Sequence, residues 1–386
     1  MKIISVVGAR PNFMKIAPFN RAIEKHNGEN KNRQIKHIIV HTGQHYDDRM
    51  SQQFFEELNI PQADINLGVG SGTHAEQVGN TMIAFEKVLL TENPDWVVVV
   101  GDVNATLACS VTAKKQWIKC CHIEAGLRSG DMTMPEEVNR IVTDRLCDLL
   151  LTPDLLSSDN LIKEGTAEER IKFVGNIMID TLEANRAKVS SLRIADIINR
   201  NLLADFNLNA AIPKGENYAL MTLHRPSNVD KKEMLAPIID FLINEVSSII
   251  TLIWPIHPRT LKKLKEFSLF DVIVKNPNII LLEPLGYLDM SRLNMNARIM
   301  LTDSGGLQEE CTVLGTPCLT LRWNTERPIT LQEFGGTSVL VGNDVKLIRK
   351  EFNKALQQSR FSRHPDLWDG KTAERCLKAI LENNIK

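Results

Sequence analysis

A run of five apolar residues, Trp96-Val97-Val98-Val99-Val100, constrains the fold of this chain more than any other segment. Both faces of such a strand must be covered, which is typical of a central strand in a parallel sheet between two layers of helices. The run ends at Gly101-Asp102, where the glycine suits a tight turn and the aspartate follows at the carboxyl end of the strand. We therefore expect an α/β fold.

Short apolar runs alternate with helical patterns in both halves of the chain. The sequence predicts strands near 2–7, 37–42, 96–100, 119–123, 149–151 and 171–174, and again near 218–223, 250–255, 278–282, 298–301, 317–321 and 338–341. It predicts helices near 14–26, 74–92, 104–116, 136–147, 156–164, 231–246, 259–267, 287–295, 305–314, 344–357 and 372–384. This alternation indicates βαβ units. We expect two doubly wound, Rossmann-like domains that face each other across a cleft, with ligands at the carboxyl ends of the strands.

The predicted domains are an N-terminal Rossmann-like domain over 1–175, an interdomain connection over 176–215 and a C-terminal Rossmann-like domain over 216–370. The connection begins with helical character and ends in a polar, turn-rich stretch, Ile212-Pro213-Lys214-Gly215-Glu216-Asn217. We expect the last helix, within 371–386, to pack back on the N-terminal domain.

The composition excludes several classes of protein. The chain carries 46 basic and 47 acidic residues, a balance that argues against nucleic-acid and membrane-surface partners. A membrane span needs about 20 apolar residues, and the apolar runs are far shorter. The start of the chain does not resemble a signal peptide, and the seven cysteines form no CxxC pair. We expect a cytoplasmic protein with reduced thiols and no bound metal.

The first strand runs into Gly8-Ala9-Arg10-Pro11, with Lys15 shortly after it. Gly8 permits a tight turn into a helix, and Pro11 suits a first helical turn. A helix N-terminus with two nearby cations indicates an anion site, although a solvated Arg10 is an equal alternative.

Three carboxylates fall where strands end or a helix begins: Asp102, Glu124 and Glu136. Each has a structural alternative: a helix N-cap for Asp102, an ion pair with Arg128 for Glu124, and a helix-dipole partner with an i,i+4 contact to Arg140 for Glu136. Carboxylates that converge on one edge of a sheet also suit acid–base catalysis, because crowding shifts their pKa values. The sequence therefore leaves both readings open.

In the second half of the chain, His224-Arg225 and His257 lie at the ends of two predicted strands. A proline directly follows Arg225, and another directly follows His257. A satisfied loop histidine is the alternative to a catalytic one. The segment Thr302-Asp303-Ser304-Gly305-Gly306 then brings a strand into a helix start whose bare N–H groups suit a diphosphate. One turn on, Glu309 or Glu310 suits a ribose, and Arg327 supplies a further cation.

Together these motifs resemble those of the non-hydrolysing UDP-N-acetylglucosamine 2-epimerases, in the same order and over essentially the whole chain. The motifs are Gly8-Ala9-Arg10-Pro11, His41-Thr42-Gly43-Gln44-His45, Gly101-Asp102, His122-Ile123-Glu124-Ala125-Gly126-Leu127-Arg128, Pro135-Glu136-Glu137-Val138-Asn139-Arg140, Leu223-His224-Arg225 and Thr302-Asp303-Ser304-Gly305-Gly306-Leu307-Gln308-Glu309-Glu310. The resemblance implies a glycosyltransferase-B-like fold, a homodimer, a UDP-sugar substrate, and no cofactor or metal. It also implies inversion at C2 by elimination of UDP, a 2-acetamidoglucal intermediate and re-addition of UDP, a reaction that supplies precursors of surface polysaccharides.

Position by position, the resemblance implies that Asp102, Glu124 and Glu136 are the catalytic carboxylates and that His224 is a candidate acid. It assigns a larger set to the UDP-sugar: Arg10, Lys15, Arg140, Arg225, Ser304, Gly305, Gly306, Glu310 and Arg327. It assigns Gln44, His45 and His257 to a second site or a lid.

Two segments depart from the commonest form of that family. Position 12 is Asn, where the usual epimerases have Glu, and the stretch 68–77 is rich in glycine and carries His74 and Glu76. The second segment also resembles relatives that act on UDP-2,3-diacetamido-2,3-dideoxyglucuronate. The substituents at C3 and C6 of the sugar therefore stay open, as does substrate activation. Hydrolytic epimerisation and glycosyl transfer are further alternatives on the same fold.

Overall fold

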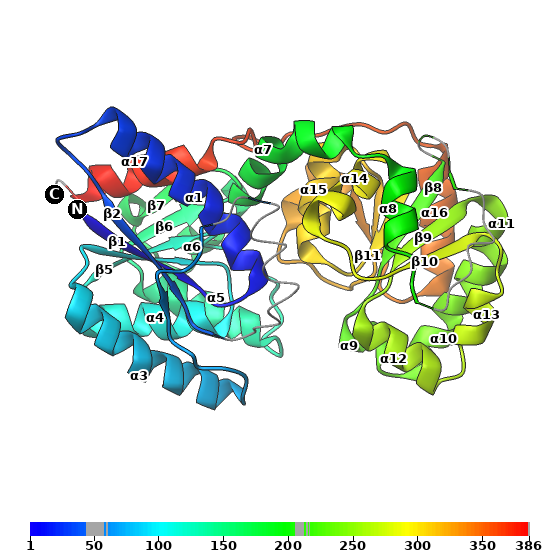
Figure 1. The fold of residues 1–386 in the computed structure, drawn as a ribbon, viewed down its shortest axis with the longest axis horizontal. Helices are drawn as coiled ribbons and strands as arrows, with labels where there is room; N and C mark the ends of the chain where they lie inside the picture. The colour runs from blue at the N-terminus through cyan, green and yellow to red at the C-terminus, as the bar shows by residue number, and fades with distance from the viewer. Residues whose placement is uncertain (44–57, 59–60, 205–211, 214, 216, 385–386) are drawn as a thin grey trace. The chain divides into compact units, whose positions relative to one another are not determined.

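Two parallel β-sheets organise the chain in the computed structural model, which describes residues 1–43, 58, 61–204, 212–213, 215 and 217–384. Contacts divide the chain into unit 1, residues 1–184 and 366–386, and unit 2, residues 185–365. Each unit contains one sheet with helices on both of its faces (Figure 1). This architecture confirms the predicted α/β class with two doubly wound sheets. The boundaries predicted at 175, 215 and 370 stay predictions.

The sheet of unit 1 has the strand order β3-β2-β1-β4-β5-β6-β7. Its strands are β1 (Lys2–Val7), β2 (Lys36–His41), β3 (Ile65–Asn66), β4 (Trp96–Val100), β5 (Lys119–Ile123), β6 (Leu149–Thr152) and β7 (Ile171–Phe173). Its helices are α1 (Arg10–Glu29), α3 (His74–Glu92), α4 (Asn104–Lys115), α5 (Pro135–Leu146), α6 (Leu155–Lys163), the first half of α7 (Ile177–Ser191), and α17 (Thr372–Asn384). The central strand β4 is buried along its whole length, as its apolar sequence predicts.

The sheet of unit 2 has the strand order β10-β9-β8-β11-β12-β13. Its strands are β8 (Tyr218–Thr222), β9 (Thr251–Pro255), β10 (Ile279–Leu282), β11 (Ile299–Thr302), β12 (Cys318–Thr320) and β13 (Ser338–Leu340). Its helices include α8 (Ile194–Arg200), α9 (Pro226–Val229), α10 (Lys232–Phe241), α11 (Ser247–Ile249), α12 (Pro258–Glu266), α13 (Phe270–Val274), α14 (Tyr287–Asn296), α15 (Gly305–Leu314) and α16 (Val345–Gln357).

The C-terminal helix α17 belongs to unit 1, where it lies alongside α1 (Figure 1). The carboxylate of Asp180 accepts hydrogen bonds from the backbone N–H groups of Thr372 and Ala373, at 3.0 and 2.7 Å, and so binds the N-terminus of α17. The indole N–H of the buried Trp368 donates to the carbonyl of Pro153 at 2.9 Å. These contacts hold the C-terminal segment on unit 1, the unit that also contains the first strand of the chain.

The structure differs from the sequence prediction mainly in short elements. Strand β3 has two residues, α9 has four and α13 has five, which is too short for a repeating apolar pattern to reveal them. The single helix predicted over 231–246 is interrupted, because a π-helical segment, Leu242–Val246, follows α10. None of these differences moves a strand that carries a candidate site residue.

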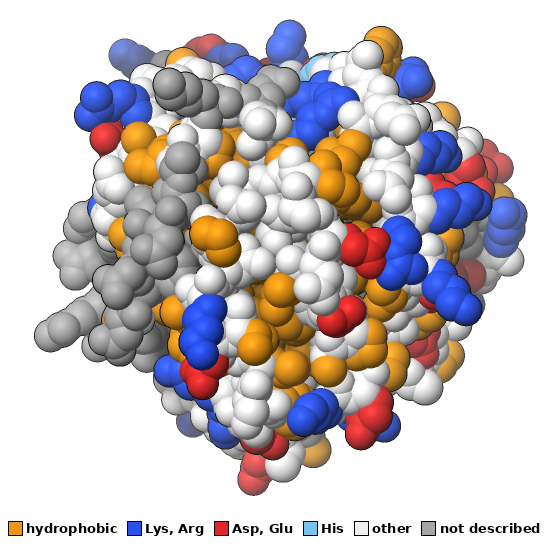
Figure 2. Space-filling model, turned by 90° about the vertical axis from the view of Figure 1, so that its right-hand side faces the viewer, with side chains coloured by type: hydrophobic (Ala, Val, Ile, Leu, Met, Phe, Trp, Pro, Cys, Tyr) orange, Lys and Arg blue, Asp and Glu red, His pale blue; other side chains and the backbone are white. Residues whose placement is uncertain are grey.

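The described surface is mixed in character. Figure 2 shows the face of unit 2 that lies at the right of Figure 1, where hydrophobic, basic and acidic side chains alternate. On the described surface of this unit, basic and acidic residues also pair, as Arg349 does with Glu245 at 2.6 Å. No helix within the described ranges is both long and apolar enough to cross a membrane.

Candidate active site

The candidate residues gather where the strand order of each sheet reverses. In unit 1 this point lies between β1 and β4, and in unit 2 it lies between β8 and β11. Doubly wound sheets bind their ligands outside the carboxyl ends of the strands at such a point. Lys15, Asp102 and Glu124 follow β1, β4 and β5 in unit 1, while His224 and Ser304 follow β8 and β11 in unit 2.

Glu124 and Lys15 form a buried ion pair at the switch point of unit 1. Their side chains are 4% and 8% exposed. The backbone of Glu124 is left-handed, with φ of 72°, a conformation that is uncommon for a residue other than glycine and that occurs at functional sites. The expected alternative, an ion pair between Glu124 and Arg128, is wrong, because Arg128 binds Asp144 and Glu164 instead.

Asn12 fixes the ends of the two central strands of unit 1. Its side-chain oxygen accepts hydrogen bonds from the backbone N–H groups of Gly8 and Ala9, at 3.1 and 2.9 Å. Its side-chain amide donates to the carbonyl of Val100 at 3.0 Å. An ionised carboxylate has no hydrogen to donate to that carbonyl, so the amide of Asn12 makes a contact that a glutamate at this position could not make.

Gly101 allows the loop after β4 to approach this cluster closely. Its φ is 69°, and a Cβ added there would lie 3.3 Å from Lys15 Nζ and 3.4 Å from Glu124 Oε2. Gly101 therefore lies against the buried ion pair, one residue before Asp102. Because β4 and β5 are neighbouring parallel strands, Asp102 and Glu124 share one edge of the sheet.

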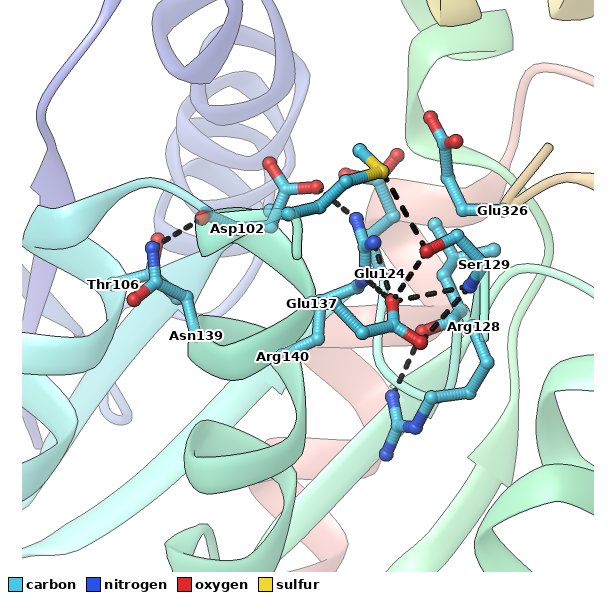
Figure 3. Close-up of polar contacts among 12 residues, drawn as sticks. Asp102, Thr106, Glu124, Arg128, Ser129, Glu137, Asn139, Arg140 and Glu326 are labelled. Carbon is cyan, nitrogen blue, oxygen red and sulfur yellow. Dashed lines mark hydrogen bonds and ion pairs between the residues drawn. The ribbon is translucent and has the colours of Figure 1, made fainter. Parts of the chain in front are cut away.

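Arg140 of α5 binds two carboxylates, those of Asp102 and Glu137 (Figure 3). The guanidinium is buried, and its Nη2 lies 2.6 Å from Glu137 Oε2. The side chain of Asp102 keeps 27% of its surface exposed. Asp102 is thus held by a cation and yet open to a ligand. The expected N-cap role of Asp102 is wrong, because Val103 occupies the N-cap of α4.

Glu137, rather than Glu136, is the carboxylate that α5 turns inward. The i,i+4 contact expected from Glu136 to Arg140 is wrong, since Glu137 makes an i,i+3 ion pair with Arg140 and Glu136 is exposed in the first turn of the helix. Glu137 also accepts hydrogen bonds from the backbone N–H groups of Ser129 and Gly130. Burial alone would raise the pKa of Glu137, but these donors and Arg140 outweigh burial and lower it.

His224 contacts a buried aspartate, Asp303, at the switch point of unit 2. Its Nδ1 lies 2.8 Å from Oδ1 of Asp303, which is fully buried, whereas 40% of the His224 side chain is exposed. Asp303 also accepts from the backbone N–H of Arg225 at 2.7 Å and from Asn228 Nδ2 at 3.1 Å. Burial would raise the pKa of Asp303, but His224 and the backbone N–H of Arg225 outweigh burial and lower it. With Nδ1 facing the carboxylate, Nε2 is the nitrogen of His224 left to meet a ligand.

Asp303 was not among the site residues predicted from sequence. One indication was present in the sequence, because Asp303 directly follows a strand. The pairing of β11 with β8, which brings Asp303 beside His224, cannot be read from the local sequence. Arg225 also joins this group, since its Nε donates to the carbonyl of Asp303 at 3.0 Å.

Helix α15 begins at the switch point with an uncapped N-terminus. Its N-cap, Ser304, makes no side-chain cap hydrogen bond, and its first turn contains no acidic residue. A Cβ added at Gly305 would lie 2.8 Å from Arg327 Nη1, so glycine there lets the guanidinium reach the helix start. At Gly306 an added Cβ would meet nothing within 4 Å. Backbone N–H groups and a guanidinium together suit a diphosphate.

The cation predicted at Arg327 is part of a buried ionic network. Arg327 binds Glu326 and, through Nε at 2.8 Å, Glu309. Arg322 binds Glu326 as well, at 2.6 Å. The two arginines are therefore balanced by two carboxylates, and removal of any one of these side chains would leave a buried charge uncompensated.

Glu310 is a buried carboxyl on α15. Burial, and secondarily the neighbouring Glu309, raise the pKa of Glu310 to about 8, although Tyr287 and Asn294 act in the opposite direction. A carboxyl of this kind carries a proton at neutral pH and can donate as well as accept a hydrogen bond. The sequence suggested that either Glu309 or Glu310 binds a ribose. In the structure Glu309 binds Arg327, and Glu310 is the glutamate whose pKa is raised.

His257 lies beside His224, with the ring centroids 5.4 Å apart. It caps α12, where its Nδ1 accepts from the backbone N–H of Arg259 at 3.1 Å. Burial, followed by the nearby His224, lowers the pKa of His257. Three other candidates lie outside the description: nothing is described of Gln44 and His45, or of the side chain of Arg10.

Among the residues described, no group of three or more His, Cys, Asp or Glu side chains is arranged to hold a metal ion. The candidates instead form two clusters of hydrogen-bonding and ionisable groups. Unit 1 brings together Lys15, Asp102, Glu124 and Arg140, and unit 2 brings together His224, Arg225 and His257 beside the start of α15.

The sequence profile of the UDP-N-acetylglucosamine 2-epimerase family matches residues 28–381. The chain belongs to this family. It is 44% identical over 382 residues to UDP-N-acetylglucosamine 2-epimerase of Methanocaldococcus jannaschii, an alignment that covers 98% of this chain and 99% of the relative. It is 37% identical to UDP-2,3-diacetamido-2,3-dideoxy-D-glucuronate 2-epimerase of Pseudomonas aeruginosa, with 89% of this chain and 88% of the relative covered.

A solved structure of the Methanocaldococcus jannaschii enzyme, in complex with UDP-GlcNAc and UDP, resembles this chain with a TM-score of 0.86 and 41% identity. The match covers 99% of this chain and 100% of that one. Family membership confirms the resemblance inferred from the motifs, and it makes the chain an isomerase of the epimerase family.

Proposed function

We propose that this epimerase interconverts UDP-GlcNAc and UDP-ManNAc without net hydrolysis, by eliminating UDP and adding it back to a 2-acetamidoglucal. The observation that carries the proposal is the pair of carboxylates, Asp102 and Glu124, each held against a cation at the switch point of unit 1. A protein that only binds a nucleotide sugar has no need of two such groups at one edge of a sheet.

The chemistry requires bases close to C2. No carbonyl is adjacent to C2, so its proton is not acidic in the ground state, and it becomes removable as the C1–O bond to UDP breaks and C1 gains positive charge. A carboxylate then takes the proton, and a second acid returns a proton to the other face. Asp102, Glu124 and Glu136 are the proposed catalytic carboxylates, with the order of their action left open.

The departing UDP requires donors and cations. In the proposal, the start of α15 at Ser304-Gly305-Gly306 and Arg225 bind the diphosphate, while Glu310 binds the ribose. His224 acts on the diphosphate through Nε2, because Nδ1 faces Asp303. Lys15 and Arg140 serve the sugar side. UDP retained in this way is returned to C1 rather than lost to solvent.

A second candidate substrate is UDP-2,3-diacetamido-2,3-dideoxyglucuronate, which is favoured by the similarity to the Pseudomonas aeruginosa 2-epimerase. Both substrates undergo the same reaction at C2 and differ at C3 and C6. We place UDP-GlcNAc first, because the archaeal relative is more similar and covers more of the chain.

The two substrates can be compared directly by NMR. The purified protein is incubated with each one, without added NAD or metal. UDP-ManNAc appearing from UDP-GlcNAc supports the proposal, whereas a faster reaction of the uronate would replace the substrate and keep the reaction. Free ManNAc and UDP would show a hydrolysing enzyme, and no change in either substrate would overturn the epimerase proposal.

The homodimer implied by the family resemblance is also part of the proposal. Ile83 and Leu90 of α3 are 61% and 68% exposed, and Trp117 is 94% exposed. Gln116, the residue before Trp117, donates a hydrogen bond to Glu86 of α3 at 2.8 Å, so the exposed apolar side chains lie on two segments in contact, and exposed apolar side chains suit a protein interface. Light scattering tests this: we expect twice the mass of the chain, and a single-chain mass for Ile83→Glu/Leu90→Glu. A wild-type monomer would contradict the dimer.

A cytoplasmic location completes the proposal. All seven cysteines are buried and free, which suits a reducing compartment. Cell fractionation tests the location, with recovery outside the cytoplasmic fraction as the contrary result.

A further inference from the structure

The loops that carry Asp102 and Glu124 both depend on left-handed backbone, at Gly101 and at Glu124. Such conformations persist where surrounding contacts hold them. The ion pairs of Asp102 and Glu124 act on the side chains and not on the backbone of the loops. A separate set of contacts, centred on His122 of β5, holds the backbone itself.

His122 is fully buried and precedes Glu124 by two residues. Its Nε2 is 2.8 Å from the carbonyl oxygen of Gly101, the residue before Asp102. Its Nδ1 is 2.6 Å from Oδ1 of Asp144. His122 thus bridges the carbonyl of Gly101 and the carboxylate of Asp144.

Asp144 of α5 extends this contact to the loop after β5. Its Oδ2 accepts from the backbone N–H of Gly126 at 3.0 Å and from Arg128 Nη1 at 2.7 Å. Burial would raise the pKa of Asp144, but His122 and Arg128 outweigh burial and lower it, which keeps the carboxylate an acceptor. Arg128 is in turn anchored to Glu164 by two hydrogen bonds, of 2.7 and 2.8 Å.

The geometry points to His122 as a positioning residue of the epimerase: through Gly101 and through Asp144 it holds the loops of Asp102 and Glu124 in register with each other. This inference rests on the proposed function, and it concerns residues that do not contact the sugar. A displacement of about 1 Å at a catalytic group can lower a rate by about 100-fold. Loss of His122 therefore slows proton return to C2 without altering the UDP-binding groups of unit 2.

The consequence is a change in how the intermediate partitions. In elimination the C1–O bond breaks, the electrons of the C2–H bond form the C1=C2 double bond, and the proton passes to a carboxylate. The intermediate then either regains a proton at C2 and UDP at C1, or leaves as free 2-acetamidoglucal and UDP. When reprotonation is slow, release is favoured. This ratio is a property of each active molecule, so partial unfolding leaves it unchanged.

The test measures free UDP and 2-acetamidoglucal against epimer formed, for wild type, His122→Gln and Asp144→Asn. His37→Gln is the matched control, because His37 is a largely buried histidine of β2 in the same sheet that binds Ser5 and Asn20. We expect both network variants to raise the ratio by about tenfold or more and the control to keep the wild-type ratio.

Three results decide the question. A wild-type ratio of released intermediate to epimer in His122→Gln, at reduced or full activity, overturns the positioning role. If His122→Gln does not fold, the same ratio measured in Asp144→Asn decides in the same way. An equal rise in His37→Gln would also overturn it, since any buried polar substitution would then suffice. A wild-type enzyme that leaves C2 unchanged refutes the proposed function instead, and is thus distinguishable from failure of this inference.

Discussion

The switch points of the two units differ in the groups that follow their strands. In unit 1, full charges meet in pairs around the strand ends, with Lys15 against Glu124 and Arg140 against Asp102. In unit 2, the strand ends carry a histidine on a buried aspartate and the bare backbone of a helix start. The same topology thus places two carboxylates, each paired with a cation, after the strands of unit 1, and a histidine beside a helix start after the strands of unit 2. Proton transfer needs the first kind of site, and retention of a diphosphate needs the second.

The largest effect should come from removing a charge in unit 1. Asp102→Asn keeps the shape of the side chain but loses a proton-transfer group, so we expect turnover to fall by about 10³-fold. Binding of UDP, measured by calorimetry, should stay within about twofold of wild type. Asp159→Asn, an exposed position of α6, is the control. Normal turnover in Asp102→Asn would remove this residue from the mechanism.

A smaller loss should follow from the corresponding change in unit 2. His224→Gln removes the ring that Asp303 orients, and we expect turnover to fall by roughly 100-fold with UDP binding weakened as well. The two units are then distinguished by UDP affinity, which changes in the unit 2 variant and not in the unit 1 variant. Equal UDP affinity in both variants would refute the division of roles.

The helix start of unit 2 can be tested at two neighbouring glycines. Gly306→Ala meets no atom of the protein within 4 Å, whereas Gly305→Ala meets Arg327 and Glu326 at 2.8 Å. If a diphosphate lies against this backbone, Gly306→Ala should weaken UDP binding by about tenfold and leave the melting temperature unchanged. Gly305→Ala should lower both. Wild-type UDP affinity in Gly306→Ala would place the diphosphate elsewhere.

The smallest effect concerns stability and the buried Glu310. Its pKa is about 8 in the folded chain and 4.5 as an ordinary carboxyl. Between these pH values the folded state holds a proton that the unfolded state has lost, so stability falls as pH rises, by up to about 1.4 kcal/mol per pH unit. Glu310→Gln should flatten this fall in urea denaturation, and the exposed Glu233→Gln should not. An unchanged pH slope in Glu310→Gln would show that Glu310 titrates normally.

Most strands could be predicted because a strand buried on both faces is apolar throughout, as β4 is. The carboxylates and the helix start were visible for a related reason, since ligands of such sheets meet the carboxyl ends of strands. The cleft between the predicted domains stays a prediction.

The supporting residues were not predictable in the same way. His122, Asp144 and Asp303 act through partners that strand pairing brings together, and pairing is not written in the local sequence. The choice between Glu136 and Glu137 depended on which side of α5 is buried, and that helix buries several polar residues, among them Arg140 and Asp144, so its apolar pattern does not define a face.

Proton exchange at C2 of the sugar by unit 1 is the claim on which the proposed mechanism depends. The direct measurement is epimerisation of UDP-GlcNAc in D2O, followed by proton NMR at C2. We expect UDP-ManNAc to form with deuterium at C2, and we expect deuterium also to enter the remaining UDP-GlcNAc as the reaction approaches equilibrium. UDP-ManNAc that retains the original C2 hydrogen would contradict the claim.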